Sequence, residues 1–350
     1  MAVNSRKLPR REISRVGDII FLLGAGASVD AGLPTVATLT DQLKKRLPRL
    51  GDVNRKIRPG FKKLFDQICR YDPQVSANYE RLFEWIDYLL KAQRDPFARV
   101  TRIKLGPSVM QAAAHFAYVV RAEIVKVFQA RKTRNAYLAR LADFLPARGR
   151  LEVFTLNYDC CLEDACAAAN IDLTTGFDPT SNRWNEQRFH GKQRGINLYK
   201  LHGSLKWFGT TDTRRLAKGL WTDSYYFLEL KPKGRRTLPK TLEVSDEPTL
   251  ILGPAPKLQS DDPFLTLYYK LHRSVQRAKV CVVLGYGYAD EHINEKLDEA
   301  IKLGTRVLNV NLAAPPTRFL SCCKFHHLNV SAKDALESGR IELELRKLGI

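Results

Sequence analysis

The stretch FLLGAGASVDAGLPT, residues 21–35, decides the fold class. It continues the apolar run DIIFLLG (18–24), which is typical of a strand buried inside a sheet, and then enters a Gly-Ala-Gly turn. Gly24 and Gly26 lack a Cβ, so their backbone can approach a phosphate closely. Ser28 and the amides of the following helix would be further ligands for the anion. The competing interpretation is a tight strand–helix turn in which the glycines serve only packing.

Two common phosphate-binding motifs are excluded at this turn. No Gly-Lys-Ser/Thr follows, so the turn is not a P-loop. The next glycine, Gly32, comes too late for the G-x-G-x-x-G spacing, and no second strand ends in an acidic residue about 20 positions later.

Five further apolar runs predict strands. They are 151–157, 196–203, 249–253, 279–285 and 306–312. Because these runs lack in–out alternation, they favour a parallel sheet covered on both faces. The sequence therefore predicts an α/β fold with one Rossmann-like, doubly wound parallel sheet in a single domain, 1–350. Helical periodicity over 36–148 predicts a mainly helical insertion, and its loss over 174–248 predicts a smaller irregular insertion.

Composition limits the environment and the partners. The 350 residues contain 57 Lys and Arg against 37 Asp and Glu, a net charge of +20 that favours polyanions or an acidic partner, or serves only solubility. The densest basic patches are 6–15 and 231–236. Seven cysteines in mostly apolar text indicate reduced thiols. With no secretory signal and no apolar run of about 18 residues, we expect a cytoplasmic protein without a membrane span.

Polar residues follow two of the predicted strands. Asn157 and Asp159 lie in TLNYD, where a strand ends and a helix begins. That carboxyl edge is where ligands bind in doubly wound sheets, although Asn and Asp are also preferred helix N-caps. His202 closes the strand of LHGSLKW, a suitable place for a general base with a pKa near neutrality.

Two later segments add candidates for the same edge. Gly285 and Gly287 form a second glycine turn in VVLGYGYADEH, and Asp290 is placed to cap the next helix. Asn309 and Asn311 interrupt the apolar strand NVNL, where side-chain amides could meet ribose hydroxyls. No metal site is predicted, because the spacing in CCKFHH (322–327) is not that of a zinc site.

The ordered series GAGAS, TLNYD, LHGS, LGYGYAD and NVN resembles the sirtuin fold superfamily, in particular bacterial sirtuin-like domains of antiphage defence proteins. The resemblance implies an NAD-binding Rossmann-like core, with NAD as substrate. The site residues that it implies follow by motif. The pyrophosphate would be cradled by Gly24, Ala25, Gly26 and Ser28. Asn157 would orient the nicotinamide ribose and the attacking water, Asp159 would lie at the carboxamide, and His202 would be the base. The adenosine side would be lined by Gly285, Tyr286 and Gly287, with Asn309 and Asn311 near the adenine ribose.

Departures from the sirtuin pattern narrow the expected activity. Sirtuin deacylases typically carry two Cys-x-x-Cys pairs for a structural zinc, and this chain has none; it also reads GLPTVATL where deacylases carry Phe-Arg. We therefore expect NAD hydrolysis to nicotinamide and ADP-ribose, in an antiphage effector that depletes NAD by abortive infection. The alternatives are an unusual NAD-dependent deacylase and a non-catalytic nucleotide- or nucleic-acid-binding subunit.

The same resemblance implies regulation by assembly. An enzyme that depletes NAD would harm its host if it were always active. We expect a homo-oligomer, or a separately encoded partner such as a HerA-like motor ATPase or a short Argonaute module.

Overall fold

The computed structural model describes residues 18–46, 58–76, 78–92, 107–129, 134–215, 221–230, 242–246, 248–252 and 262–350. Its centre is a seven-stranded sheet in the order β10-β9-β8-β1-β2-β4-β3, with every pairing parallel. The strands are β1 (Ile19–Leu23), β2 (Arg150–Thr155), β3 (Leu173–Thr174), β4 (Gly195–Lys200), β8 (Val280–Leu284), β9 (Arg306–Val310) and β10 (Phe325–Leu328). The predicted parallel sheet is confirmed, and β3 and β10 are the strands that the apolar runs did not indicate.

The sheet is buried on both faces, which explains its continuous apolar strands. All five residues of β1 are buried, with Phe21 in one core cluster and Ile20 in the other. β2 and β8 flank β1, so Phe21 lies in register with Val153 and Val282. Successive side chains point to opposite faces of a strand, and both faces need apolar residues here.

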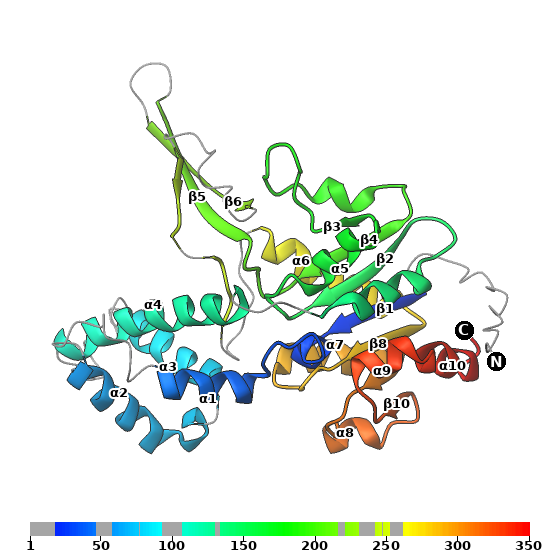
Figure 1. Cartoon of the computed structure of the whole chain (residues 1–350), viewed down its shortest axis with the longest axis horizontal. Coiled ribbons are helices and arrows are strands. Elements are labelled where there is room, and N and C mark those ends of the chain that lie inside the picture. The colour runs from blue at the N-terminus through cyan, green and yellow to red at the C-terminus, as the bar shows by residue number, and fades with distance from the viewer. Residues whose placement is uncertain are drawn as a thin grey trace, which may run out of the picture.

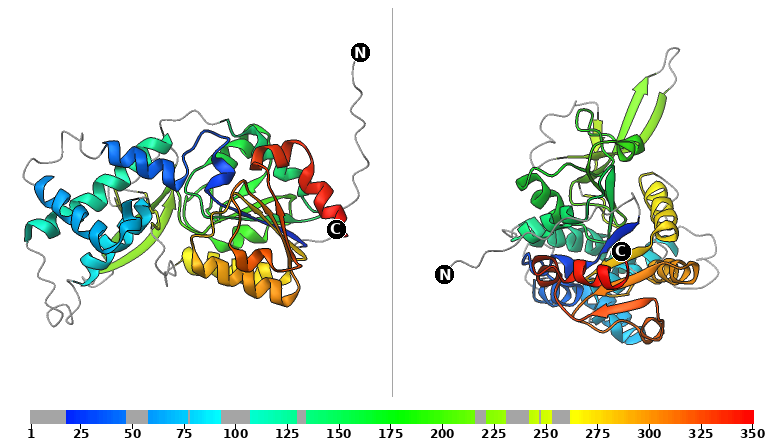
Figure 2. Two further views of the ribbon diagram at one scale, coloured as in Figure 1. Left: turned by 90° about the horizontal axis from the view of Figure 1, so that it is seen from below. Right: turned by 90° about the vertical axis from the view of Figure 1, so that its right-hand side faces the viewer.

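Helices cover each face, as in a doubly wound fold (Figures 1 and 2). One core cluster joins the sheet to η5 (Ala136–Phe144), α5 (Cys161–Ala168), α9 (Ala332–Glu337) and α10 (Arg340–Lys347). The other cluster joins it to α6 (Phe264–Arg277), α7 (Glu291–Leu303) and α8 (Thr317–Leu320). In the part of the chain that is described, every helix is too short or too polar to cross a bilayer.

The predicted helical segment 36–148 has two parts. α1 (Val36–Arg46), α2 (Arg58–Tyr71), η3 (Pro73–Ser76), α3 (Tyr79–Ala92) and α4 (Pro107–Gln129) form a separate lobe beside the sheet (Figure 1). This lobe has its own core cluster, which Tyr158 and Leu250 join from outside the lobe. η5 instead packs on the sheet through Leu138 and Leu141, and so belongs to the central layer.

The segment predicted as irregular, 174–248, contains regular structure besides β4. β5 (Trp207–Arg215) pairs antiparallel with β6 (Trp221–Glu229) and β7 (Leu242–Val244), and the β5–β6 ribbon projects from the body of the molecule (Figure 1). Polar residues fill consecutive positions, 210–215 in β5 and 222–224 in β6, so these strands lack both the apolar run and the alternation that mark a strand in the sequence.

The apolar run 249–253 forms no strand of the parallel sheet over its described residues, 249–252. Leu250 makes one isolated antiparallel bridge with Gly203. Leu250 is buried in the core of the helical lobe and Ile251 in the core of the sheet. The run is therefore apolar because it connects two cores, a case that periodicity cannot distinguish from a short strand. The basic patches 6–15 and 231–236 lie outside the described residues.

Candidate active site at the carboxyl edge of the sheet

The two glycine turns, after β1 and after β8, pack directly on each other. The amides of Gly24 and Gly26 donate to the carbonyls of Leu284 (2.9 Å) and Gly285 (2.8 Å). A Cβ on Gly24 would lie 2.5 Å from the Cα of Tyr286, and one on Gly26 would lie 2.7 Å from the Cα of Gly285. This close backbone approach is sufficient to explain both glycines, as the packing interpretation of the turn expects.

The first turn offers a phosphate fewer free backbone N–H donors than the sequence motif suggested. The turn enters η1 (Ala25–Ser28), a single 3₁₀ turn, and the amides of Gly24 and Gly26 are already used. Ser28 is buried, with its hydroxyl beneath the turn. The assignment of Gly24, Ala25, Gly26 and Ser28 to the pyrophosphate stays a prediction.

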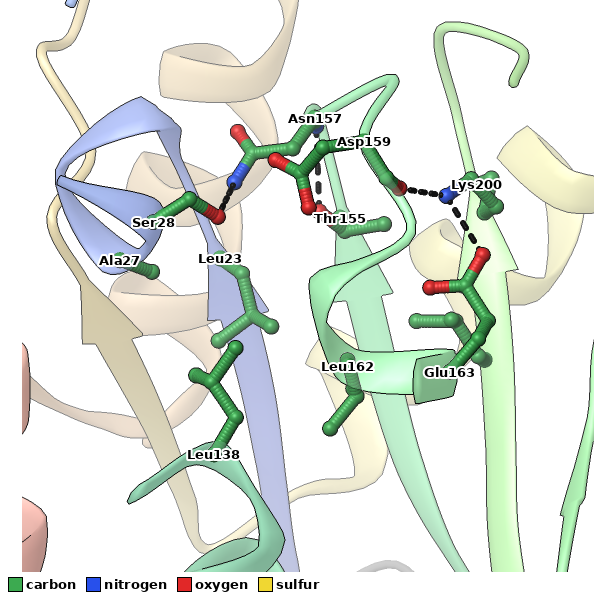
Figure 3. A pocket seen from close by; sticks show the side chains of 11 residues that line it. Leu23, Ala27, Ser28, Leu138, Thr155, Asn157, Asp159, Leu162, Glu163 and Lys200 are labelled. Carbon is green, nitrogen blue, oxygen red and sulfur yellow. Dashed lines mark hydrogen bonds and ion pairs between the residues drawn. The ribbon is translucent and has the colours of Figure 1, made fainter. Parts of the chain in front are cut away.

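Asn157 ties the end of β2 to the first turn. Its Nδ2 donates to the Gly24 carbonyl (2.9 Å) and to Ser28 Oγ (3.2 Å), the contact drawn in Figure 3. Both bonds use Nδ2, which leaves Oδ1 as the atom able to accept a hydrogen bond from a water or a ligand. Asn157 therefore does not cap the following helix and joins two of the predicted motifs across 133 positions of sequence.

Asp159, in contrast, behaves as a capping residue. Its Oδ1 accepts a hydrogen bond from the amide of Cys161 (2.9 Å) at the start of α5, and its side chain is buried. Cys160 is the N-cap residue of α5, so Asp159 lies one position before the cap and supports the first turn in a way close to the capping role that Asp favours. Its contact with a nicotinamide carboxamide stays a prediction.

Lys200 and Glu163 form a buried ion pair that the sequence analysis did not identify. Lys200 Nζ lies 2.8 Å from Glu163 Oε1 and also donates to the Asp159 carbonyl (Figure 3). Burial lowers the pKa of Lys200, but the negative groups around it, Glu163 foremost, outweigh this and hold the pKa above its usual value. The only sequence signal was a lysine inside the otherwise apolar strand text INLYKLHG.

A cavity of about 10 Å³ lies between these side chains. Ser28, Asn157, Asp159, Glu163 and Lys200 supply its polar wall, and leucines of β1, β4, α5 and η5 close it from below (Figure 3). It is about the size of one water molecule. A nucleotide would have to lie over this polar floor, because the cavity itself cannot contain one.

His202 lies in the turn after β4, beside the end of β2. β2 and β4 are hydrogen-bonded neighbours, with Thr155 opposite Lys200. The amide of Leu205 donates to the Tyr158 carbonyl (3.1 Å), which holds the two strand ends together. His202 and Asn157 therefore leave adjacent strands at the same edge of the sheet, as predicted.

The side chain of His202 lies close to those of two residues at the start of α7. One donor atom each from His202, Asp290 and His292 lies within 4.8 Å of the other two. His202 and Asp290 are buried, with exposed fractions of 2% and 6%. Asp290 and His292 were not predicted to share a site with His202. Among the described residues, these three side chains are the one set of three or more that is spaced to hold a metal ion.

The second glycine turn is held by its own side chains. Gly285 has φ +62°, and the Tyr286 hydroxyl lies 3.0 Å from two acceptors, the Asp290 carbonyl and Asn294 Oδ1, which share its single proton. Tyr286 is buried, so it supports the turn from below. A Cβ on Gly287 would meet no atom within 4 Å, so this exposed glycine can approach a ligand.

The two asparagines of the β9 segment have different surroundings. Asn309 is fully buried in β9, and its Nδ2 lies 3.0 Å from Nδ1 of His327 in β10. Asn311 is half-buried beyond the strand end, where its Nδ2 donates to the Tyr286 carbonyl (2.8 Å) and so supports the second turn. Contacts of either residue with a ribose stay predictions.

A second, larger cavity of about 590 Å³ lies at the opposite edge of the sheet, by the amino ends of β2 and β4. Its lining is strongly basic. Arg148, Arg150, Lys192, Lys270 and Arg277 contribute to it together with His190, against the single carboxylate of Glu152. Arg150 is committed to structure, because its guanidinium contacts Asp172, Asn197 and the Ile196 carbonyl.

Comparison with known proteins locates the family in the second half of the chain. Residues 151–319, which include β2, β4, His202 and the second glycine turn, match the family described as the SIR2-like domain. This segment, just under half of the chain, is similar to the SIR2-like domain. The match begins beyond the first glycine turn, so the GAGAS segment joins this domain through the sheet, where β1 lies between β2 and β8.

Solved structures of sirtuins align with this chain over most of its length. A Sir2 homologue bound to 2'-O-acetyl-ADP-ribose has 17% identity and a TM-score of 0.43, covering 94% of this chain and 92% of that one. A complex of a Sir2 homologue with NAD has 16% identity and a TM-score of 0.41, with coverages of 94% and 90%. These TM-scores are too low to carry an argument about function. A comparison with curated proteins finds no match.

Proposed function

We propose that this protein binds NAD⁺ and hydrolyses its nicotinamide–ribose bond. The observation that carries the proposal is the hydrogen bond of Asn157 to both Gly24 and Ser28, which brings two motifs of the predicted site together at the edge where His202 also lies. The match to the SIR2-like domain supports the choice of ligand.

Hydrolysis of this bond requires the site to stabilise the charge on the ribose, to position a water molecule and to accept a proton. Breaking the bond to cationic nicotinamide leaves positive charge on the ribose, water adds its hydroxyl to the anomeric carbon, and the remaining proton must be accepted. Asn157 Oδ1 would orient that water, and His202 would accept its proton. NAD⁺ and water then give nicotinamide, ADP-ribose and a proton.

The residues present fit a dinucleotide that lies across the sheet edge. The turns after β1 and β8 form a continuous backbone surface, with Gly287 open to solvent above Tyr286. The small cavity beneath gives this surface a polar floor of Ser28, Asn157 and Asp159. The assignments of Gly285, Tyr286 and Gly287 to the adenosine side are part of the proposal.

The experiment is NAD⁺ turnover by the purified full chain, read as released nicotinamide. Asn157→Ala and His202→Ala should each lower turnover by about 10²–10⁴-fold, the usual effect of removing an acid–base or orienting group. His190→Ala, which alters an exposed histidine far from the edge, is the control. Turnover that survives both substitutions would refute the assignment of these residues.

An antiphage role, by NAD depletion in abortive infection, extends this proposal. It rests on the resemblance of the motif series to defence-associated sirtuin-like domains, and on the harm that unregulated NAD loss would cause. Such an enzyme needs a trigger, so we propose a homo-oligomer or a separately encoded partner, a HerA-like motor ATPase or a short Argonaute module. Turnover with and without the neighbouring gene product, in the cytoplasm of phage-challenged cells, tests the idea.

Deacylation is the less favoured use of the same site. The chain has no Cys-x-x-Cys pair, so the structural zinc module that accompanies sirtuin deacylases is missing from its sequence. NAD⁺ consumption that depends on an acetylated peptide would favour deacylation over hydrolysis.

The basic cavity favours a second candidate function, binding of a nucleotide or nucleic acid without catalysis. Its volume of about 590 Å³ is in the range of small-molecule sites, and its cationic lining suits phosphates. Lys270→Glu and Arg148→Glu should weaken binding of single-stranded oligonucleotides. Each should also reduce the slope of log K against log salt concentration by about one, the value for one lost phosphate contact. Salt-sensitive binding with no NAD⁺ turnover would favour this function.

A further inference from the structure

We propose that His202, Asp290 and His292 form a binding site for a divalent transition-metal ion of the zinc type, and that the ion switches off the site by occupying His202. The metal site stands on geometry alone. The inhibitory effect rests on the proposed function, in which His202 is the base.

The three donor groups come together from distant parts of the chain. His202 follows β4, whereas Asp290 and His292 precede and begin α7, after β8. Two strands, β1 and β2, separate β8 from β4 in the sheet, yet the three donor atoms lie within 4.8 Å of one another. Two imidazole nitrogens and a carboxylate oxygen are preferred ligands of Zn²⁺ and related ions.

The spacing is close to that of a formed site. Metal–ligand bonds of about 2.0–2.1 Å in tetrahedral geometry place ligand atoms about 3.3 Å apart. The widest allowed separation of 4.8 Å must therefore shorten by about 1.5 Å, which side-chain rotation can supply. Three protein ligands also leave a fourth position for water, as in open zinc sites.

The backbone around Asp290 keeps its carboxylate out of the usual capping role. Asp290 is the N-cap residue of α7, but its side chain makes no capping hydrogen bond. The Tyr286 hydroxyl holds the Asp290 backbone on both sides, since it donates to the carbonyl (3.0 Å) and accepts from the amide (3.2 Å). Tyr288 has φ +56°, a conformation that is uncommon for a non-glycine residue. The turn therefore directs a buried carboxylate to the two histidines.

His292 has the outer partner that a metal-binding histidine usually needs. Its Nε2 lies 3.2 Å from the hydroxyl of Tyr268 in α6, so a metal ion would bind this ring through Nδ1. Such outer hydrogen bonds fix the ring orientation of a ligand, and their loss typically costs 10–100-fold in metal affinity.

An ion at this site would compete directly with the proposed chemistry. The nitrogen of His202 that binds a metal cannot also accept a proton from water. The buried Asp290 carboxylate would share the positive charge of the ion, which favours a divalent cation over an uncharged ligand. The cluster contains no cysteine, so the bound ion would have only nitrogen and oxygen ligands.

The test uses Co²⁺ as a spectroscopic probe in the metal-stripped full chain. We expect one Co²⁺ per chain, with visible absorption bands, no thiolate-to-cobalt charge-transfer band, and displacement by Zn²⁺. Asp290→Asn and His292→Ala should weaken Co²⁺ binding by at least about tenfold, and Tyr268→Phe by about 10–100-fold. His326→Ala, in the edge strand β10, should leave Co²⁺ binding unchanged. The proposal would be overturned if the unaltered chain bound no Co²⁺, or if folded Asp290→Asn and Tyr268→Phe bound Co²⁺ as tightly as the unaltered chain. Circular dichroism shows which variants are folded.

NAD⁺ turnover with and without Zn²⁺ tests the switch separately. Zn²⁺ should inhibit the unaltered chain, and the fold-inhibition should fall in Tyr268→Phe in step with its Co²⁺ affinity. Co²⁺ binding without Zn²⁺ inhibition would refute the switch and keep the metal site. A chain with no NAD⁺ turnover at all would refute the proposed function, while the Co²⁺ titration would still decide whether the metal site exists.

Discussion

Removing the charge of Glu163 should destabilise the protein more than removing any comparable surface carboxylate. Lys200 has a fully buried side chain and Glu163 a 12% exposed one, and they are 2.8 Å apart. In Glu163→Gln the lysine would stay charged in the interior without its counter-ion. Breaking one side of a buried pair costs about 3–5 kcal/mol, which corresponds to a fall in Tm of about 4–7 °C for a chain of 350 residues.

The exposures predict an order among the variants. Lys200→Met leaves Glu163 near the surface, where water can solvate it, so this change should cost less than Glu163→Gln. Asp164→Asn is the matched control from the same helix, because Asp164 and Lys206 are 3.6 Å apart with exposures of 59% and 25%. An exposed pair contributes less than about 1 kcal/mol.

Urea unfolding followed by tryptophan fluorescence measures these differences, since Trp207 is fully buried just beyond β4. Glu163→Gln should also lower NAD⁺ turnover, because Lys200 holds the Asp159 carbonyl beside Asn157. If Glu163→Gln cost no more than Asp164→Asn, the ion pair would not stabilise this edge and the reasoning would be wrong.

Three further predictions test the turns and the thiols. Gly285→Ala should cost about 2–4 kcal/mol, since φ is +62° and its Cβ would lie 2.3 Å from the Ala27 amide nitrogen, whereas Gly287→Ala should stay within about 0.5 kcal/mol by urea unfolding. Tyr137→Phe should cost about 0.5–1.5 kcal/mol in the same assay, because it removes the 2.5 Å hydrogen bond to the Ala27 carbonyl. Burial raises the pKa of Cys281 to about 12, so at neutral pH iodoacetamide should modify exposed Cys323 first, as peptide mass spectrometry would show. The raised thiol pKa also predicts stability that is intact below about pH 9 and falls as the pH rises towards 12, because the unfolded chain ionises first.

Predictions from the sequence succeeded where the signal was local. Continuous apolar runs identified β1, β2, β4, β8 and β9, because a strand buried on both faces needs an apolar residue at every position. The same rule failed at 249–252, where apolar side chains fill two different cores, and it missed the polar strands β5 and β6. Local patterns report burial, and burial has several causes.

Residue type alone could not separate structural from chemical roles at the strand ends. Asn157 and Asp159 are two positions apart, yet Asp159 supports the first turn of α5 and Asn157 reaches back to the first glycine turn. Gly24 was predicted to cradle the pyrophosphate and Gly285 to line the adenosine side, and the structure shows that both glycines allow two turns to touch. Such roles depend on which turn lies opposite, and residues more than 250 positions away determine this.

The sequence by itself determined five strands of the parallel sheet, the order of the motifs and the edge at which they end, because each depends on side chains close together in the chain. Only the tertiary structure decided that β8 lies beside β1, that Lys200 meets Glu163, and that Asp290 and His292 reach His202. These meetings follow from sheet order and from packing around turns of unusual backbone conformation. No local pattern of residues encodes the distance between two segments that folding brings together.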